Sequence, residues 1–287
     1  MNRLLAWLDG DASDDPLPHL RLFARVFVLV LGAEYWARAI PTWSQLAPLY
    51  VWALGTVTVG CAATFVPGLA RPAFALLAAT HAAVIAAEFP ATGNHAYLEL
   101  YALLLLALLR PADPAEGRVL RRSLCWLVCL VLFASGLQKI AHGYYFQGQY
   151  LAYSLWIESF RPVLAPLFRP DEYARLTAFP ADLGSGPFLV TSPAVLAVSN
   201  LVYATELLLP VLLLWPPTRT LGVAGTLAML AGIEVAAREV FFGLVFANGV
   251  LLFLPRAAPA GVVLAVAAFL AWLLLGAIGV VPAMVYH

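Results

Sequence analysis

The sequence predicts an all-α fold, a polytopic helical bundle integral to a membrane, with eight or nine transmembrane helices. Of the 287 residues, 63% are hydrophobic and only 11% are charged, whereas a soluble domain has about 25% charged residues. The mean hydropathy is +0.88. Sixteen basic and sixteen acidic residues cancel, so the chain lacks the positive surface that nucleic-acid binding needs. The expected partner of its surface is a lipid bilayer.

Nine apolar segments account for the bundle, because a helix needs roughly 20 apolar residues to cross a bilayer. In order they are residues 20–40, 45–66, 72–89, 94–110, 120–141, 192–215, 218–238, 240–255 and 259–284. The third, fourth and eighth are short, and a re-entrant segment among them would reduce the count to eight. Residues 1–19 are polar and lack the layout of a cleavable signal. We therefore expect a cytoplasmic N-terminal segment, followed by a single transmembrane domain over 20–287.

The arginines predict the orientation of the bundle. If the N-terminus is cytoplasmic, most arginines fall on the inner side, including the group between Arg110 and Arg122. Cytoplasmic loops of membrane proteins carry this excess of positive charge. The long connection 142–191 is then extracytoplasmic, and the expected location is the inner membrane of a bacterium.

The connection 142–191 begins with a stretch rich in aromatic rings. Its members are Tyr144, Tyr145, Phe146, Tyr150, Tyr153, Trp156 and Phe160. Such rings favour the membrane interface, where one end of the side chain is dry and the other is wet. We expect Tyr144–Phe160 to form an interfacial amphipathic helix that covers a site as a lid, although a purely structural aromatic belt is the simpler interpretation.

Charged groups within apolar segments are costly, so each one requires an explanation. Glu34 and Arg38 are four residues apart, as are Glu234 and Arg238. This spacing places both members of a pair on one helix face, where they neutralise each other. Glu206 lies in the middle of its segment, and both a hydrogen-bonded structural carboxylate and a functional one remain open there.

Lys139 is the only lysine, whereas the other fifteen basic residues are arginines. Lysine offers what arginine does not, because a buried amine can lose its proton and a guanidinium stays charged. A lysine that reaches the membrane surface along its own helix is the alternative. The neighbouring Gln138, and the pair Ser135-Gly136, which allows close helix approach, favour a lined cavity instead.

His95 follows Asn94 at the outer start of its helix and shares a face with Glu99, four residues on. In the orientation above, Asn94, His95 and Lys139 lie at the same side of the membrane and are expected to converge beneath the lid. An amine, an imidazole and an amide in a dry cavity suit proton abstraction. His81 is expected to be a hydrogen-bonded core histidine. No His or Cys spacing of a metal site occurs in the sequence, so no metal is expected.

Three stretches are similar to the membrane part of vitamin K-dependent γ-glutamyl carboxylase and its bacterial relatives, the horizontally transferred transmembrane (HTTM) domain family. Asn94-His95-Ala96-Tyr97-Leu98 resembles Asn-His-Ser-Tyr-Leu, and Gly136-Leu137-Gln138-Lys139-Ile140 resembles Gly-x-Lys-Lys-Leu. A fainter match is Phe242-Gly243-Leu244-Val245-Phe246. Tyr145-Phe146-Gln147-Gly148 stands near the family's Trp-x-x-Gly, one residue late. We expect no counterpart, within these 287 residues, of the lumenal β-rich portion with which the eukaryotic enzyme engages its peptide.

The resemblance implies a membrane enzyme that oxygenates a reduced vitamin K-type naphthoquinone (menaquinol) to its epoxide. O₂ and CO₂ are the further co-substrates, and γ-carboxylation of glutamyl residues in a peptide or separate partner protein is the coupled reaction. An un-ionised Lys139 then starts the reaction, and His95 lies next to the quinone oxygen. The residues expected to bind the lipophilic quinone are Asn94, Gln138, Tyr145 and Trp156.

A different class of function stays open beside this one. The chain is then a non-enzymatic integral membrane protein, either a quinone- or lipid-binding subunit or an accessory to a neighbouring complex. A small-solute transporter is the third class, but the sequence shows no inverted repeat or paired broken helices to support it.

Overall fold

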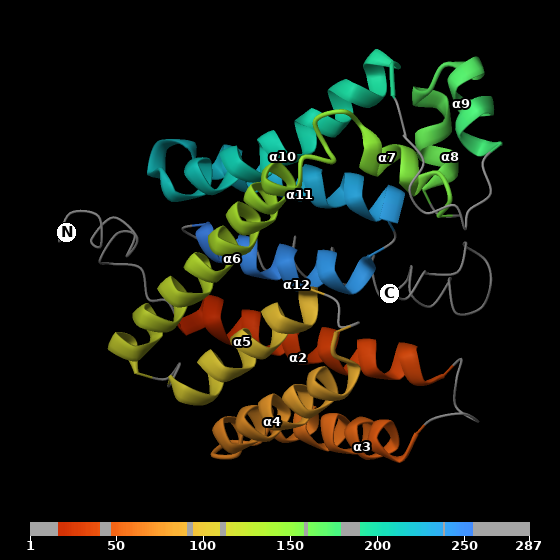
Figure 1. Cartoon of the computed structure of the whole chain (residues 1–287). Coiled ribbons are helices and arrows are strands. Elements are labelled where there is room, and N and C mark those ends of the chain that lie inside the picture. The colour runs from red at the N-terminus through yellow and green to blue at the C-terminus, as the bar shows by residue number, and fades with distance from the viewer. Residues whose placement is uncertain are drawn as a thin grey trace. The chain divides into compact units, whose positions relative to one another are not determined.

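The computed structural model describes residues 17–40, 47–90, 94–109, 113–157, 160–178, 190–237 and 239–254, and these are helical with no strand (Figure 1). The all-α prediction is therefore confirmed for the described part of the chain. The α-helices are α2 (Leu17–Ala39), α3 (Pro48–Ala63), α4 (Ala70–Glu88), α5 (Asn94–Leu108), α6 (Pro114–His142), α7 (Gln149–Ser154), α8 (Arg161–Leu164), α9 (Pro170–Thr177), α10 (Pro193–Leu214), α11 (Arg219–Ala237) and α12 (Val240–Val250). The 3₁₀ turns are η2 (Ala165–Leu167), η4 (Pro216–Thr218) and η5 (Leu251–Phe253).

Each of the first eight apolar segments coincides with a helix, and the ninth, 259–284, lies outside the described residues. Prolines begin several of these helices. Pro48 and Pro193 stand in the first turn of α3 and α10, where the missing N–H costs nothing and the fixed φ already suits a helix. Hydropathy predicted the positions of these eight helices, and the prolines explain where α3 and α10 begin.

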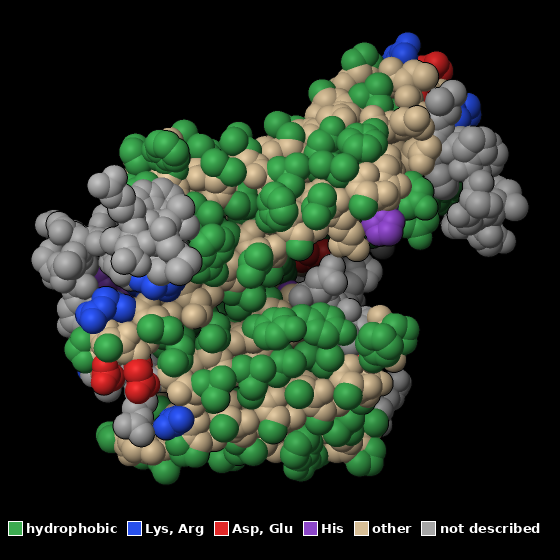
Figure 2. All heavy atoms as spheres, turned by 60° about the vertical axis from the view of Figure 1, so that its left-hand side comes forward, with side chains coloured by type: hydrophobic (Ala, Val, Ile, Leu, Met, Phe, Trp, Pro, Cys, Tyr) green, Lys and Arg blue, Asp and Glu red, His purple; other side chains and the backbone are tan. Residues whose placement is uncertain are grey.

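Four helices in the described residues are long and apolar enough to cross a membrane, namely α4, α6, α10 and η4 with α11. The helices α3, α5 and α12 with η5 are apolar but shorter. In the view of Figure 2, hydrophobic side chains cover much of the surface and charged side chains gather in a few places. The chain is thus compatible with an integral membrane protein, and the coarse prediction of a membrane helical bundle stands.

The described residues fall into two units, with the boundary inside α6. Unit 1 comprises the chain up to Val128 and again from Val240. In it α2 packs against α3 and α12, and α4 packs against α3 and α5. The buried side chain of Asn248 on α12 donates a hydrogen bond to the carbonyl of Phe23 on α2 (2.9 Å). This bond supplies a partner for a polar group that the apolar surroundings would otherwise leave unsatisfied.

Unit 2 runs from Cys129 to Glu239, and its main helix pair is α10 with α11. A Cβ atom on Gly222 of α11 would lie 2.7 Å from the backbone nitrogen of Leu213 on α10. Since backbone cannot move aside, only glycine permits this approach. The short helices α7, α8 and α9 share a small apolar core with the start of α10.

The connection 142–191 is more structured than predicted, and its aromatic stretch is not one helix. Within Tyr144–Phe160, the described residues form turns on both sides of the six-residue α7. The expectation of a continuous interfacial helix was therefore wrong. The physical reason lies in Gly143 and Gly148, which adopt φ values of +73° and +69°. These left-handed conformations end α6 and bend the chain before α7.

Glu172 fixes the end of this connection to the start of α10. It lies in the first turn of α9 and accepts hydrogen bonds from the backbone N–H groups of Thr191 (2.5 Å) and Ser192 (3.0 Å). Both hydroxyls donate to it as well. Burial acts to raise the pKa of Glu172, but these hydrogen bonds outweigh burial and lower it.

Candidate functional site

The Lys139 cluster of unit 2 consists of Lys139, Ser135, Glu206 and Tyr145. The Nζ of Lys139 donates hydrogen bonds to Glu206 Oε1 (2.8 Å) and to Ser135 Oγ (2.7 Å). The Ser135 hydroxyl donates to the same Glu206 oxygen (3.2 Å). Nζ also lies 5.4 Å from the centroid of the Tyr145 ring, within the range of a cation–π contact. An ammonium, a hydroxyl, a carboxylate and an aromatic face therefore meet at one point.

Two helices bring this cluster together, and a glycine sets their separation. Ser135 and Lys139 stand one turn apart on α6, so both side chains reach the same face. A Cβ atom on Gly136 would lie 2.9 Å from Leu207 Cγ and 3.2 Å from Glu206 Cβ on α10. Gly136 thus permits the close helix approach that the Ser135-Gly136 pair predicts, and this approach brings Glu206 within reach of Lys139.

Tyr145 is held in place by the turn that follows α6. The Ser199 hydroxyl of α10 donates to the carbonyl of Tyr145 (2.6 Å), and the side-chain amide of Asn200 donates to the carbonyl of Phe146 (3.3 Å). The Tyr145 ring stacks on Tyr150 with centroids 4.8 Å apart. Burial first, and then the neighbouring Tyr150 and Glu206, raise the pKa of Tyr145. Its phenol therefore keeps its proton and remains a hydrogen-bond donor.

The ion pair of this cluster is largely removed from solvent. The side chains of Lys139 and Glu206 are 18% and 6% exposed. An isolated charge in an apolar helix is expensive, and a hydrogen-bonded partner of opposite charge reduces that cost. The pair also gives the Lys139 ammonium a proton acceptor at hydrogen-bonding distance.

The Glu34 cluster of unit 1 is a second group of buried ionisable side chains, drawn from α2, α4 and α5. Glu34 Oε1 accepts a hydrogen bond from Arg38 Nη2, in agreement with the pairing that their spacing predicts. His95 Nε2 lies 3.3 Å from that same oxygen and 3.0 Å from Arg38 Nη2. His95 therefore joins the Glu34–Arg38 pair.

His81 forms the other end of the Glu34 cluster. The Tyr35 hydroxyl lies 2.9 Å from His81 Nδ1, and His81 Nε2 lies 3.0 Å from the carbonyl oxygen of Ala96. The expectation of a hydrogen-bonded core histidine is confirmed. The Oε2 of Glu99 lies 3.2 Å from the same Nε2, and the whole of Glu99 is 0% exposed.

The residues singled out from the sequence are distributed over both units. Lys139 and Tyr145 meet in the Lys139 cluster, whereas His95 belongs to the Glu34 cluster, so a cavity shared by Lys139 and His95 stays a prediction. Gln138 is exposed on α6, and Trp156 is half-buried in the turn after α7. Asn94 begins α5, and its side chain lies outside the described part of the structure, as does Arg238.

Sequence reasoning missed the partners of these residues. It left the role of Glu206 open and did not connect it with Lys139, which is 67 positions earlier. It placed His95 and Glu99 on one face but did not predict their neighbours on other helices, which are Glu34 for His95 and His81 for Glu99. The only available signal was the apolar context of each carboxylate, because spacing within one helix carries no information about partners on another.

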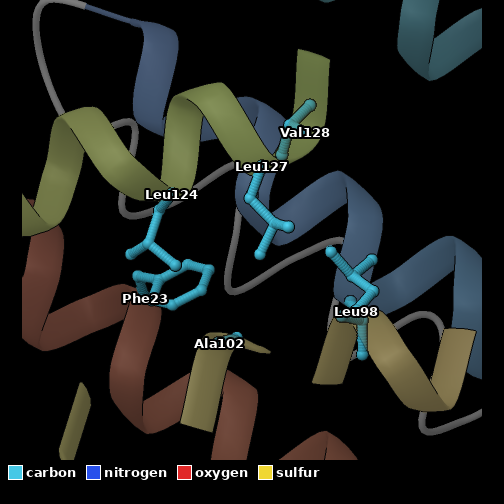
Figure 3. A pocket seen from close by; sticks show the side chains of 8 residues that line it. Phe23, Leu98, Ala102, Leu124, Leu127 and Val128 are labelled. Carbon is cyan, nitrogen blue, oxygen red and sulfur yellow. The ribbon is translucent and has the colours of Figure 1, made fainter. Parts of the chain in front are cut away.

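Two other features of the described residues carry no chemistry. No group of three His, Cys, Asp or Glu side chains in them is placed to hold a metal ion. A small cavity in unit 1 is purely apolar, as Figure 3 shows for side chains from α2, α5 and α6. Its lining residues are Phe23, Leu98, Ala102, Leu124, Leu127, Val128, Val245 and Gly249. None of the candidate site residues lines it.

The chain matches no protein-family model, no curated protein and no solved structure.

Proposed function

We propose that this chain is a membrane enzyme that deprotonates a lipophilic quinol, with Lys139 as the proton-accepting residue. The observation that supports this most directly is the hydrogen bond from Lys139 Nζ to Glu206 Oε1 (2.8 Å), in an apolar setting and at the only lysine of the chain. A base must lie within hydrogen-bonding reach of its proton and must be able to pass that proton on. Glu206 is the group to which Lys139 can pass its proton.

The proton balance of this step is simple. Transfer of one proton from the Lys139 ammonium to the Glu206 carboxylate leaves a neutral amine and a neutral acid. The amine then takes the proton of a quinol hydroxyl, and the resulting quinolate faces the lysine ammonium. Such transfers are favoured where water is excluded, because water would compete for every hydrogen bond.

The aromatic side of the cluster supports a flat, lipophilic substrate. Tyr145 presents its ring 5.4 Å from Nζ and stacks on Tyr150, and a quinol ring packs favourably on such surfaces. The sequence resemblance supports the same substrate class, with menaquinol, O₂ and CO₂ as co-substrates. It also assigns His95 to the quinone oxygen and a glutamate-containing peptide or partner protein to the coupled carboxylation.

The membrane arrangement belongs to the same proposal. We infer eight or nine crossings, with the N-terminus in the cytoplasm and the Lys139 cluster near the extracytoplasmic face of a bacterial inner membrane. The arginine distribution supports this orientation, in which the last turn of α6, with Lys139, is at the extracytoplasmic end of the helix. Labelling of single introduced cysteines at 67–69 and at 143–148 with an impermeant reagent, in intact cells, tests it. Only the second position is expected to react.

The experiment that tests the enzymatic proposal uses the full chain in lipid nanodiscs with reduced menaquinone analogue, O₂ and bicarbonate. Quinol oxidation and epoxide are measured by chromatography and mass spectrometry, and a glutamate-containing peptide is added in a second reaction. Epoxide without a carboxylated peptide would support the quinol chemistry and contradict the peptide half. Absence of quinol oxidation, with quinol binding intact, would contradict the enzymatic proposal altogether.

A second candidate function has an observation in its favour. Lys139 satisfies two of its donors internally, on Glu206 and Ser135, so the ion pair also suits a purely structural connection between α6 and α10. In that case the protein is a non-enzymatic quinone- or lipid-binding subunit or accessory protein. The nanodisc assay distinguishes the two, because a binding protein retains quinol without oxidising it.

A further inference from the structure

The Glu34 cluster contains a carboxyl group that lacks a hydrogen-bond donor. Glu99 is 0% exposed, and neither of its oxygens receives a hydrogen bond. His81 Nε2 is close at 3.2 Å, but its N–H points to the carbonyl of Ala96. The Tyr35 hydroxyl meets Nδ1, so a neutral His81 that accepts at Nδ1 and donates at Nε2 satisfies both contacts.

Glu34 also has a carboxyl oxygen that receives no hydrogen bond. Its Oε1 is occupied by Arg38 and lies beside His95, whereas its Oε2 is buried and has no donor. The carboxyl groups of Glu34 and Glu99 also interact with each other through their side chains. Two ionised carboxylates offer only acceptors and cannot bond to each other, but a carboxylic acid donates to a carboxylate.

The charges lead to the same conclusion. Arg38 balances one carboxylate, so a second ionised carboxylate in this setting would be a buried charge without compensation. The other groups that interact with Glu99 are Tyr35 from α2, His81 from α4 and His95 from α5. Glu88 of α4 is occupied separately by the Tyr50 hydroxyl of α3 (3.1 Å). One proton on the two carboxyls removes both the excess charge and the missing donor.

We propose that Glu99 and Glu34 form a proton-binding site in which one proton is held between the two carboxyl groups and exchanges through His95. The proton would reach the site from the more exposed side chains. Arg38 is 36% exposed, His95 16% and Glu34 3%. Glu99, which is 0% exposed, is the most buried end of this route. When the proton moves to His95, two carboxylates face Arg38 and an imidazolium, so the cluster stays neutral in both states.

This inference does not rest on the quinol proposal, although the two have His95 in common, and the ligand here is a proton rather than an organic molecule. Ionisable side chains that are paired inside a membrane bundle are the usual carriers of protons there. The inference therefore holds for a binding protein as well as for an enzyme, and its test requires no quinol.

Infrared spectroscopy of the full chain in nanodiscs, at neutral pH, tests the inference. The wild type is expected to show the C=O band of a protonated carboxylic acid, and labelling with ¹³C-glutamate and transfer to D₂O both shift it. Glu99→Gln should remove the band. Glu88→Gln, the matched control on the neighbouring helix, should leave it unchanged. His95→Phe should retain the band but slow its shift in D₂O.

Thermal stability provides a second, independent measurement. A glutamine is isosteric with a protonated glutamate and its amide donates to Glu34, so Glu99→Gln should unfold at the temperature of the wild type or higher. Glu34→Gln should unfold earlier, because it leaves Arg38 without its carboxylate. A wild type without an acid band would overturn the proposal, as would a band that persists in Glu99→Gln. A band that disappears on addition of Na⁺ would identify a cation site instead.

Discussion

The Nζ of Lys139 lies 2.8 Å from Oε1 of Glu206, so the only lysine of the chain is ion-paired with a carboxylate on another apolar helix. The pair joins α6 to α10 within unit 2 and is approached by the Tyr145 ring. It has two physical consequences. It offsets the cost of two charges in an apolar setting, and it provides the lysine with a proton acceptor.

We predict that Lys139→Arg abolishes quinol oxidation while the protein folds and inserts normally. Arginine keeps the charge and can pair with Glu206, but it does not lose its proton. Removal of a general base typically slows a reaction by about 10²–10⁴-fold. The measurement is the rate of epoxide formation in nanodiscs at matched protein amounts.

Arg71→Lys is the control for that substitution. Arg71 donates to the carbonyls of Ala107 and Leu108, and lysine can supply this positive charge as well. Oxidation should therefore proceed at the wild-type rate in the control. Retained oxidation in Lys139→Arg would remove Lys139 as the base and favour the binding-protein function.

We predict a strong energetic coupling between Lys139 and Glu206. Loss of one partner of a buried pair leaves an uncompensated charge and costs about 3–5 kcal/mol, whereas replacement of both by apolar residues is often neutral. The variants Lys139→Met and Glu206→Leu should each lower the free energy of unfolding, and the double variant should recover most of the loss. Unfolding in mixed micelles, evaluated as a double-mutant cycle, measures this coupling. Additive losses would show that the two side chains do not interact.

We predict that Gly136→Ala destabilises the α6–α10 contact. The added Cβ would lie 2.9 Å from Leu207 Cγ, and overpacking of this kind typically costs about 1–3 kcal/mol. Gly232→Ala on α11 is the matched control, since nothing lies within 4 Å of the added atom. Thermal unfolding of both variants in the same detergent is the measurement, and equal midpoints would contradict the close approach.

We predict that the attachment of α9 to α10 weakens in acid. Because the folded state lowers the pKa of Glu172, its stabilising contribution is present above the ordinary pKa of a glutamate. The contribution is lost as the pH falls through the lowered value. Hydrogen exchange of the α9 amides, corrected for the intrinsic effect of pH, should therefore accelerate in acid in the wild type. The change should be absent in Glu172→Gln and present in Asp171→Asn, whose side chain is exposed in the same turn.

Hydropathy by itself predicted the apolar helices of this protein. Eight apolar segments coincide with helices. A segment with so few charges suits apolar surroundings, and there a helix is favoured because it pairs its own backbone N–H and C=O groups. The sequence also singled out Lys139 and the Glu34–Arg38 pair. An unusual residue type and a spacing of four are local properties, so they can be read without a fold.

Only the tertiary structure decided which ionisable groups meet. Glu206 stands 67 positions from Lys139, and Glu34 stands 61 positions from His95, so the partners come from different helices. Their meeting depends on helix rotation and, for Lys139 and Glu206, on close approach at Gly136, which hydropathy does not encode. The aromatic pattern did not predict the turn at Tyr145 either, because the bend of the chain there depends on two glycines with positive φ. Composition determines that these segments are helical and apolar, whereas side-chain packing between helices determines which charges they bury together.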